Sequence, residues 1–405
     1  MSEPGFGERP IRLLTFSTLY PHSGRPNHGV FVENRLRHLL DGGGITASVV
    51  APVPWYPRVL ARRLPGRAWA AHILAAHVEM RHGLRVLHPR YPVIPRYGMS
   101  VAPALLYAAA RRAVAAAQRD GLQFDVIDAH YLYPDGVAAV ALGRALGVPV
   151  VITARGSDVT QLPDYPAPRR MIQWAMRQAD ALIAVSAGLK TAMVALGADP
   201  ARITVLRNGV DLVMFQPQDR VAARAALGLT GPTLLSVGLL NERKGHHRII
   251  AAMPELPGWR LLIVGDGPDR PKLAALAQER GVGDRVQFIG PVPHGSLSSY
   301  YSAADALVLA SSREGWANVL LEAMACGTPV IASPIPGNPE VVQEAAAGVI
   351  MPENSAAGVV AGLRALEAVR RPAAETRAYA ERFSWDQTSS GQRALFQQVL
   401  SAYPR

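Results

Sequence analysis

The sequence predicts an α/β protein with two doubly wound domains, and three observations support this fold class. The chain has 405 residues, which exceeds the roughly 100–200 of an ordinary domain, and 49% of them are hydrophobic, which excludes a mainly disordered chain. Strand-length apolar runs alternate with helical patterns along both halves, and this order produces parallel strands. A stretch without periodicity, DLVMFQPQDR at 211–220, separates the two series and is the natural linker.

The first half begins with the apolar run IRLLTFS (11–17) and the helical pattern VFVENRLRHLLDGG, whose two glycines fit the end of a helix. The same alternation continues, with strands expected at 47–53, 125–130, 149–154, 181–186 and 203–206 and helices at 100–119, 135–146, 168–179 and 187–196.

The second half repeats this scheme, with strands expected at 233–238, 260–265, 286–290, 306–310 and 329–333 and helices at 245–252, 269–280, 296–303, 316–325 and 355–369. We therefore expect Rossmann-like domains at 1–212 and 213–382, each with ligand-binding residues near the carboxyl ends of its strands.

Composition narrows the function classes. The net charge is +11, and it is uneven: residues 1–212 carry 24 basic and 14 acidic side chains, residues 213–405 carry 18 and 17. Such basicity suits nucleic acid, an anionic membrane or an anionic substrate. A single cysteine, Cys326, excludes an internal disulfide framework and a multi-cysteine zinc site. The polar start MSEPGFGERP does not resemble a signal peptide, and no apolar run approaches about 18 residues, so we expect a soluble, cytoplasmic chain.

The segment SSREGWANVLLEAMACGTPVIAS (311–333) holds the sharpest chemical pattern. A helix starting near Trp316 would point its first amides at a phosphate, because a helix N-terminus carries partial positive charge. Glu322, further along, and Glu314, just before the helix, could accept hydrogen bonds from hydroxyls. By spacing alone, two surface glutamates explain the pattern as well. The amides in question belong to Trp316, Ala317, Asn318 and Val319.

In its full context this segment resembles the family 4 retaining glycosyltransferases, which have the GT-B fold of two facing Rossmann-like domains. The resemblance covers the whole chain, and the closing FSWDQTSSGQRALFQQVL implies that residues 383–405 pack back on the N-terminal domain. Its other motifs are ARGSDV (154–159), VSAGLK (185–190), RNGVD (207–211), LLNERKGHHRII after TLLSVG, LLIVGDGP (261–268) and VQFIGPVP (286–293).

The resemblance implies roles in the C-terminal domain. Arg243 and Lys244 match the pair that holds the donor diphosphate, Arg243 less firmly because Leu239 stands where many members have an arginine. Glu322 matches the ribose ligand, and Glu314 matches the residue that contacts donor-sugar hydroxyls. The remaining donor residues lie at strand ends: the Ile289 backbone would read the nucleobase, and Gly238 and Gly265 would line the cleft, although Gly265 also fits a purely structural turn.

In the N-terminal domain, PHSGRPNHGVFVENRL (21–36) matches the loop that approaches the donor phosphates, where Gly29 would let the backbone come close. His130 occupies the position of a family histidine near the transferred sugar, and a packing role is equally open. Arg155 stands where the family often has a second histidine, and its cation would suit an anionic acceptor or donor.

The implied reaction moves a sugar from a UDP- or GDP-linked donor to a hydroxyl acceptor with retention. The acceptor would be a glycan or a lipid-linked glycan of an envelope or exopolysaccharide pathway. No Asp-x-Asp signature is present, so we expect no metal and no cofactor besides the donor. A nucleotide-sugar epimerase would need a carboxylate and histidine set that we cannot place, and an NAD dehydrogenase would need Gly-x-Gly-x-x-Gly after the first strand. A nucleic-acid partner is not expected, because no binding motif accompanies the charge.

The basic excess concentrates in residues 58–119, which hold 11 arginines and one acid, Glu79. Arginines beside aromatic residues suit an anionic bilayer, so Arg62, Arg63 and Arg67 predict a docking face for a membrane or an anionic acceptor, with a peripheral position on the inner face of the cell membrane. A solvated arginine-rich face explains the segment equally well.

Overall fold

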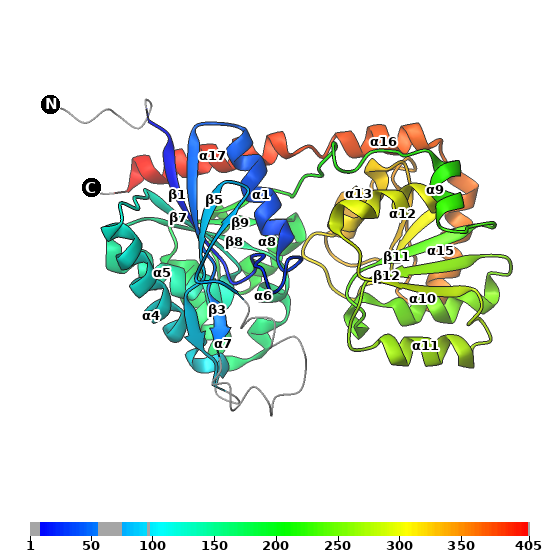
Figure 1. Ribbon diagram of the computed structural model, residues 1–405, viewed down its shortest axis with the longest axis horizontal. Coiled ribbons are helices and arrows are strands. Elements are labelled where there is room, and N and C mark those ends of the chain that lie inside the picture. The colour runs from blue at the N-terminus through cyan, green and yellow to red at the C-terminus, as the bar shows by residue number, and fades with distance from the viewer. Residues whose placement is uncertain (1–8, 56–74, 95–97, 404–405) are drawn as a thin grey trace. The chain divides into compact units, whose positions relative to one another are not determined.

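The computed structural model describes residues 9–55, 75–94 and 98–403, and the chain divides into two compact units (Figure 1). Unit 1 comprises Met1–Arg207 and Asp386–Arg405, and unit 2 comprises Asn208–Trp385. The predicted docking residues Arg62, Arg63 and Arg67 lie outside the described residues.

Unit 1 is built on an eight-stranded sheet in the order β10-β9-β8-β7-β1-β2-β5-β4, in which only the edge pair β4–β5 is antiparallel. The central strands are buried along their whole length, as parallel strands covered on both faces require. Its strands are β1 (Ile11–Phe16), β2 (Ile45–Val50), β4 (Val78–Arg81), β5 (Leu84–Leu87), β7 (Val126–His130), β8 (Val150–Ala154), β9 (Ala181–Ala184) and β10 (Ile203–Val205); β3 (Val53–Trp55) pairs separately with β6 (Arg90–Pro92).

Helices cover both faces of this sheet. Leu36 and Leu39 of α1 (Val30–Asp41) share one hydrophobic core with Phe396 and Val399 of α17 (Trp385–Ala402), so these two helices cover the same face. Three helices that pack on one another lie on the other side in Figure 1: α4 (Gly98–Arg119), α5 (Val137–Leu146) and α7 (Pro166–Gln178). The shorter α6 (Ser157–Thr160) and α8 (Ala187–Ala195) follow β8 and β9.

Unit 2 has a six-stranded, wholly parallel sheet in the order β13-β12-β11-β14-β15-β16. Counted along the chain this order is 3-2-1-4-5-6, the Rossmann arrangement, in which the connections reverse direction between the first and fourth strands. The strands are β11 (Thr233–Val237), β12 (Arg260–Val264), β13 (Val286–Gly290), β14 (Ala306–Leu309), β15 (Val330–Ala332) and β16 (Gly348–Ile350).

The helices of unit 2 bury apolar faces on both sides of the sheet. Those of α10 (His246–Ala252), α11 (Arg270–Glu279) and α15 (Ala356–Val369) form one core with the sheet, and α13 (Asn318–Ala325) packs on α12 (Leu297–Ala303) and α16 (Ala373–Glu381). The remaining helices are α9 (Arg220–Ala226) and α14 (Asn338–Val341).

The predicted fold class is confirmed, and two local predictions need correction. The helix expected from Trp316 begins at Asn318, because Ala317 has non-helical backbone angles. The segment expected to be a linker ends in α9, where the Asp219 carboxylate accepts hydrogen bonds from the amides of Val221 and Ala222 and so caps the helix. Within the described residues, no helix is both long and apolar enough to span a membrane.

Candidate functional site

The residues of unit 2 predicted to bind the diphosphate lie at the switch point of its sheet, between β11 and β14, where the strand order reverses. β11 and β14 are neighbours in the sheet, and the loops after them carry Lys244 and Glu314 respectively. In open α/β sheets this point is the preferred place for a ligand, because the connections from the two strands leave in opposite directions and open a crevice.

Two cations converge on Glu314. The Lys244 Nζ lies 2.7 Å from Glu314 Oε1, and the Arg243 Nη1 lies 3.4 Å from Oε2. Burial alone would raise the pKa of the Glu314 carboxyl, but the charges of Lys244 and Arg243 lower it overall. The three side chains therefore form a cluster with one surplus positive charge, which suits a diphosphate.

The loop that carries the two cations is held in place by backbone contacts. The Asn241 side chain accepts a hydrogen bond from the Lys244 amide at 3.2 Å and starts the single 3-10 turn Glu242–Lys244. The Ser312 amide donates to the Arg243 carbonyl at 2.8 Å, which ties this loop to the one after β14.

Two glycines allow close packing at the strand ends near Lys244. Gly238 and Gly265 directly follow β11 and β12 with φ of 153° and 137°, and a Cβ on Gly265 would lie 2.0 Å from the Gly238 carbonyl oxygen. A Cβ on Gly238 would lie 3.3 Å from the Lys244 side chain. Larger residues would therefore push apart the strand ends on which the cation cluster stands.

Glu322 lies on α13 and is 7% exposed. Its Oε2 accepts a hydrogen bond from the Tyr301 hydroxyl at 2.8 Å, and its Oε1 accepts one from His294 Nε2 at 3.0 Å. The predicted ribose ligand is thus an oriented carboxylate with two partners that the sequence did not suggest.

Ile289, predicted to read the base through its backbone, is the extra residue of a β-bulge. The pairing with β12 passes from Ile263–Phe288 directly to Val264–Gly290, so Ile289 lies opposite no residue of β12. A bulge leaves the backbone groups of its extra residue outside the ladder, which is what a backbone contact to a ligand requires.

The four backbone amides predicted to form a phosphate site do not all belong to the first turn of a helix. Trp316 and Ala317 precede α13, and the Asn318 amide already donates to the Trp316 carbonyl at 3.2 Å. Val319 lies in the first turn. The Trp316 side chain is 7% exposed and packs against Phe383.

Unit 1 has a switch point of its own, between β1 and β7. The Ser17–Gly29 loop follows β1, and the Asp135 carboxylate, after β7, accepts hydrogen bonds from the amide and the hydroxyl of Thr18. The Thr18 carbonyl in turn lies 3.1 Å from His28 Nε2. Burial raises the pKa of Asp135 to about 7 although these bonds oppose the shift.

Gly29 allows this loop to close on itself. It has φ of +72° and comes directly before α1, and a Cβ there would lie 2.3 Å from the carbonyl carbon and oxygen of Leu19. The close approach that the sequence assigned to a ligand is therefore, in the structure, an approach to the loop's own backbone.

His130, predicted to lie near the transferred sugar, is 1% exposed, and protein groups flank both ring nitrogens. Its Nε2 lies 3.2 Å from Asp128 Oδ2 and its Nδ1 lies 2.7 Å from Arg155 Nη2. Burial lowers its pKa to about 4, although Asp128 opposes this, so the ring is neutral at physiological pH.

This buried cluster continues to the C-terminal helix. Gln392 of α17 donates to Asp128 Oδ2 at 3.1 Å and accepts from Arg35 Nε at 2.8 Å. Arg155, predicted to belong to the acceptor or membrane surface, has its guanidinium turned toward His130 and 5.3 Å from the centre of the Phe31 ring.

The structure thus brings together Arg243, Lys244 and Glu314 in unit 2, and His130 and Arg155 in unit 1. Sequence reasoning missed four residues: two hold Glu322 and two belong to the cluster around His130. Only Asp128, two residues before His130 on the same strand, gave a usable signal. Among the described residues, no three His, Cys, Asp or Glu side chains gather as ligands for a metal ion. The four missed residues are Asp128, Gln392, His294 and Tyr301.

Two family models match the chain. The model for glycosyl transferases group 1 matches residues 218–383, and the model for glycosyltransferase family 4 matches residues 54–213. Among curated proteins, the D-inositol 3-phosphate glycosyltransferase of Segniliparus rotundus is 35% identical over 300 residues, 68% of this chain and 66% of that protein. The D-inositol 3-phosphate glycosyltransferase of Mycobacterium tuberculosis (strain H37Ra) is 33% identical over 303 residues, which cover 69% of this chain and 63% of that protein. The match therefore spans just under two thirds of these relatives' length.

Solved structures resemble the chain over nearly its full length. Sucrose-phosphate synthase from Thermosynechococcus elongatus superposes with a TM-score of 0.77 at 23% identity, covering 97% of this chain and 100% of that one. HepE from Anabaena in complex with UDP-glucose superposes with a TM-score of 0.71 at 19% identity, covering 96% of this chain and 99% of that one. At these identities the likeness concerns the fold.

Proposed function

Since this chain belongs to the group 1, family 4 glycosyltransferases, we propose that it is a retaining hexosyltransferase that moves a sugar from a nucleotide-diphosphate donor to a hydroxyl acceptor. The observation that carries the proposal is the cluster of Arg243, Lys244 and Glu314 at the switch point of unit 2. A leaving nucleotide diphosphate gains negative charge, and a positioned pair of cations stabilises that charge.

The other donor contacts follow from the same unit. Glu322 would accept hydrogen bonds from the ribose, the bulged Ile289 would present its backbone to the base, and Val319 in the first turn of α13 would add an amide near the phosphates. Glu314, held ionised by its two cations, would accept hydrogen bonds from hydroxyls of the donor sugar. HepE was crystallised with UDP and with UDP-glucose, which supports a nucleotide-sugar donor and makes a UDP-linked sugar the first to test, with a GDP-linked sugar second.

We assign a front-face mechanism to the transfer. The bond between the anomeric carbon and the diphosphate oxygen breaks while the acceptor oxygen forms its bond to the same face, and the acceptor proton passes to the leaving phosphate. A double displacement would need a carboxylate nucleophile. Glu314 is occupied by Lys244 and Arg243, and Asp128 is 1% exposed, so neither is placed for that role. Charge stabilisation by Arg243 and Lys244 replaces a divalent ion in this scheme.

The family resemblance favours unit 1 for the acceptor, and we propose that the acceptor is a hydroxyl of a glycan or a lipid-linked glycan. The curated relatives carry a different acceptor in their names, D-inositol 3-phosphate, and a small phosphorylated polyol is therefore the second candidate. Arg155, whose guanidinium lies against His130, adds a cation to unit 1 that would suit the phosphate of an inositol phosphate or of a lipid-linked glycan.

We further propose that unit 1 docks on an anionic membrane. Arg111, Arg112 and Arg119 of α4 are exposed. Exposed apolar side chains lie in or just before the arginine-rich region 58–119, among them Ile94 at 43% and Trp55 at 41%. Basic and apolar groups together bind an anionic bilayer more strongly than charge alone. Charge reversal of Arg111 and Arg112, and separately of Arg62, Arg63 and Arg67, should abolish co-sedimentation with anionic liposomes. Wild-type protein that does not sediment with them would disprove the docking.

A donor and acceptor screen tests the main proposal. The purified chain is incubated with UDP- and GDP-linked hexoses and with lipid-linked glycans or inositol phosphate, and products are identified by mass spectrometry and their anomeric configuration by NMR. We expect an α-linked product from an α-linked donor, undiminished by EDTA and formed far more slowly by Lys244→Ala. An inverted product, or loss of turnover with EDTA, would overturn the mechanism; no transfer from any donor would overturn the function.

A further inference from the structure

Two side chains of very different accessibility hold Glu322. Tyr301, which donates to Oε2, is 0% exposed, whereas the His294 side chain, which donates to Oε1, is 27% exposed. An ionised carboxylate only accepts hydrogen bonds, so His294 Nε2 carries the hydrogen in this contact. Glu322 itself is only 7% exposed. Of its two partners, the His294 imidazole is therefore the one that solvent or a ligand can reach.

His294 also follows the expected base contact closely in the sequence. It opens a 3-10 turn (His294–Ser296) shortly after β13, the strand whose bulged Ile289 is the expected contact for the base. Phe215 packs against the imidazole edge to face at 5.1 Å. One short segment thus carries the backbone expected to meet the base and the imidazole that occupies the expected ribose ligand.

We propose that His294 keeps Glu322 oriented while the donor site is empty, and that the ribose hydroxyls of the donor displace it with release of a proton. This inference rests on the proposed function, since it takes Glu322 as the ribose ligand. His294 acts through Glu322 and is therefore a positioning residue.

The charges around His294 give the direction of the proton transfer. Burial alone would lower the pKa of His294, but its hydrogen bond to Glu322 and the charges of Glu322 and Asp211 raise it above the ordinary histidine value. The groups that face this pair from the neighbouring elements are Tyr301 on α12 and, behind it, Cys326 and Arg377. When ribose takes the place of the imidazole, the contact with Glu322 is lost and burial remains, so the pKa falls and the imidazolium gives up its proton.

The consequence is a pH-dependent donor affinity. At a pH between the lower pKa of displaced His294 and the higher pKa of paired His294, binding releases up to one proton, and the affinity rises with pH by up to about tenfold per unit. Above both values the imidazole is neutral in both states, and the affinity no longer changes with pH.

Calorimetry with UDP-glucose and GDP-glucose tests the inference. Their diphosphates are esterified at both ends, so the probes lack the phosphate group that titrates near pH 6 in a free nucleoside diphosphate. Titrations from about pH 6 to about pH 8.5, in two buffers of different ionisation enthalpy, count the protons released. We expect up to one proton for the wild type and none for His294→Gln, whose amide can still donate to Glu322 but does not titrate.

Two further variants make the result specific. His38→Gln, the same substitution on α1 of unit 1, is the matched control. Donor binding to it should release as many protons as binding to the wild type. Glu322→Gln should weaken binding at every pH by more than about tenfold, because a carboxylate accepts more strongly than an amide. Proton release that persists in His294→Gln, or a wild type that binds without proton release while Glu322→Gln binds weakly, would overturn the inference and leave the proposed function standing. If neither glucose donor binds the wild type, the titrations use the nucleotide sugar found in the screen, and if no nucleotide sugar binds, both the inference and the proposed function fall.

Discussion

Lys244 Nζ lies 2.7 Å from Glu314 Oε1, and the two residues follow strands that are neighbours at the switch point of unit 2. The pair is largely buried, with 15% and 11% of the two side chains exposed, so its charges are weakly screened by solvent. In this contact the carboxylate balances the ammonium. A bound diphosphate would offer a second and larger anionic partner to the same ammonium.

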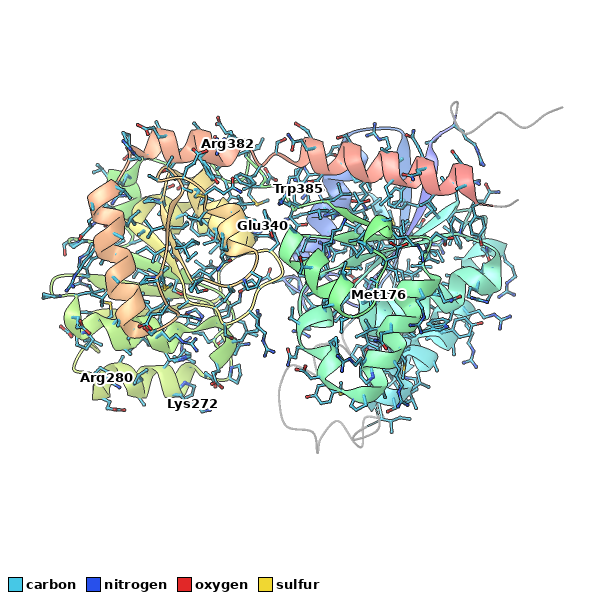
Figure 2. All side chains as sticks on the ribbon, turned by 180° about the vertical axis from the view of Figure 1, so that it is seen from behind. Met176, Lys272, Arg280, Glu340, Arg382 and Trp385 are labelled. Atoms are coloured by element: carbon cyan, nitrogen blue, oxygen red, sulfur yellow. The ribbon has the colours of Figure 1, made fainter. Side chains whose placement is uncertain are left out.

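Removing this ammonium should slow transfer strongly. Lys244→Ala is expected to lower kcat on the order of 10²- to 10³-fold, because one positioned donor to the developing charge is lost. Lys272→Ala is the matched control: Lys272 extends from α11 (Figure 2), and its side chain is 83% exposed. Steady-state kinetics with the donor found in the screen would measure both. A Lys244→Ala enzyme as fast as the control would contradict the assignment.

Gly29 and Gly43 provide a comparison of strain with and without a steric clash. Both have positive φ, 72° and 69°, but a Cβ at Gly29 would meet Leu19 at 2.3 Å while one at Gly43 would meet nothing within 4 Å. Gly43→Ala should cost about 1–2 kcal/mol of unfolding free energy, from the backbone conformation alone. Gly29→Ala should cost about 1–3 kcal/mol more. Urea unfolding of both variants checks this, and equal costs would show that the loop after β1 relaxes freely.

Gln392 should matter more to stability than its position near the C-terminus suggests. Gln392→Ala removes a hydrogen-bond partner from Arg35 and another from Asp128, both buried, and should cost about 2–3 kcal/mol. Gln397→Ala, an exposed position on the same helix, should cost less than about 0.5 kcal/mol. Urea unfolding measures both, and hydrogen exchange should show α17 opening more often in the first variant only. Comparable losses in the two variants would refute the role of the buried cluster.

Asp135 should make stability fall as pH rises. Burial raises its folded-state pKa to about 7, above the unfolded value of 3.8, so the folded state binds more protons between these values and is disfavoured as pH increases through them. Asp135→Asn lacks this dependence. Its melting temperature relative to the wild type should therefore rise between about pH 5 and about pH 8, levelling off above the folded-state pKa of about 7. A difference independent of pH would show that Asp135 does not titrate in this range.

Most strands were predictable because strand-length apolar runs are a local signal, whereas β4, β5, β6 and β16 were not expected. The roles of Arg243 and Lys244 came from the family resemblance, and their contact with Glu314 was not predicted. Apolar runs of strand length mark β11 and β14, and residues just after such strands must gather at the same sheet edge, which brings Lys244 to Glu314. The helix at Asn318 was misplaced by two residues because the apolar pattern does not reveal where the backbone turns helical.

The side-chain partners were not predictable, for a different reason. The bulge at Ile289 depends on the register between two strands, and nothing in VQFIG signals the skipped residue. Asp128 and Gln392 are far apart in the chain and meet only because α17 packs beside α1 on the same face of the sheet. The resemblance implied a place for His130 near the transferred sugar, with a packing role equally open, and nothing in the sequence indicated that its two ring nitrogens lie against Asp128 and Arg155.

The chain leaves unit 1 after Arg207 and re-enters it at Asp386, with all of unit 2 made in between. During synthesis, the face of the sheet that α17 covers therefore stays open until the ribosome has translated the whole of unit 2. Leu36 and Leu39 cannot pack against Phe396 and Val399 until the end of the chain has been translated. Unit 2, which is continuous, can finish folding first, so the order of folding runs against the order of translation. A stop codon that removed only α17 would spare unit 2 and expose the core of a unit encoded almost entirely upstream.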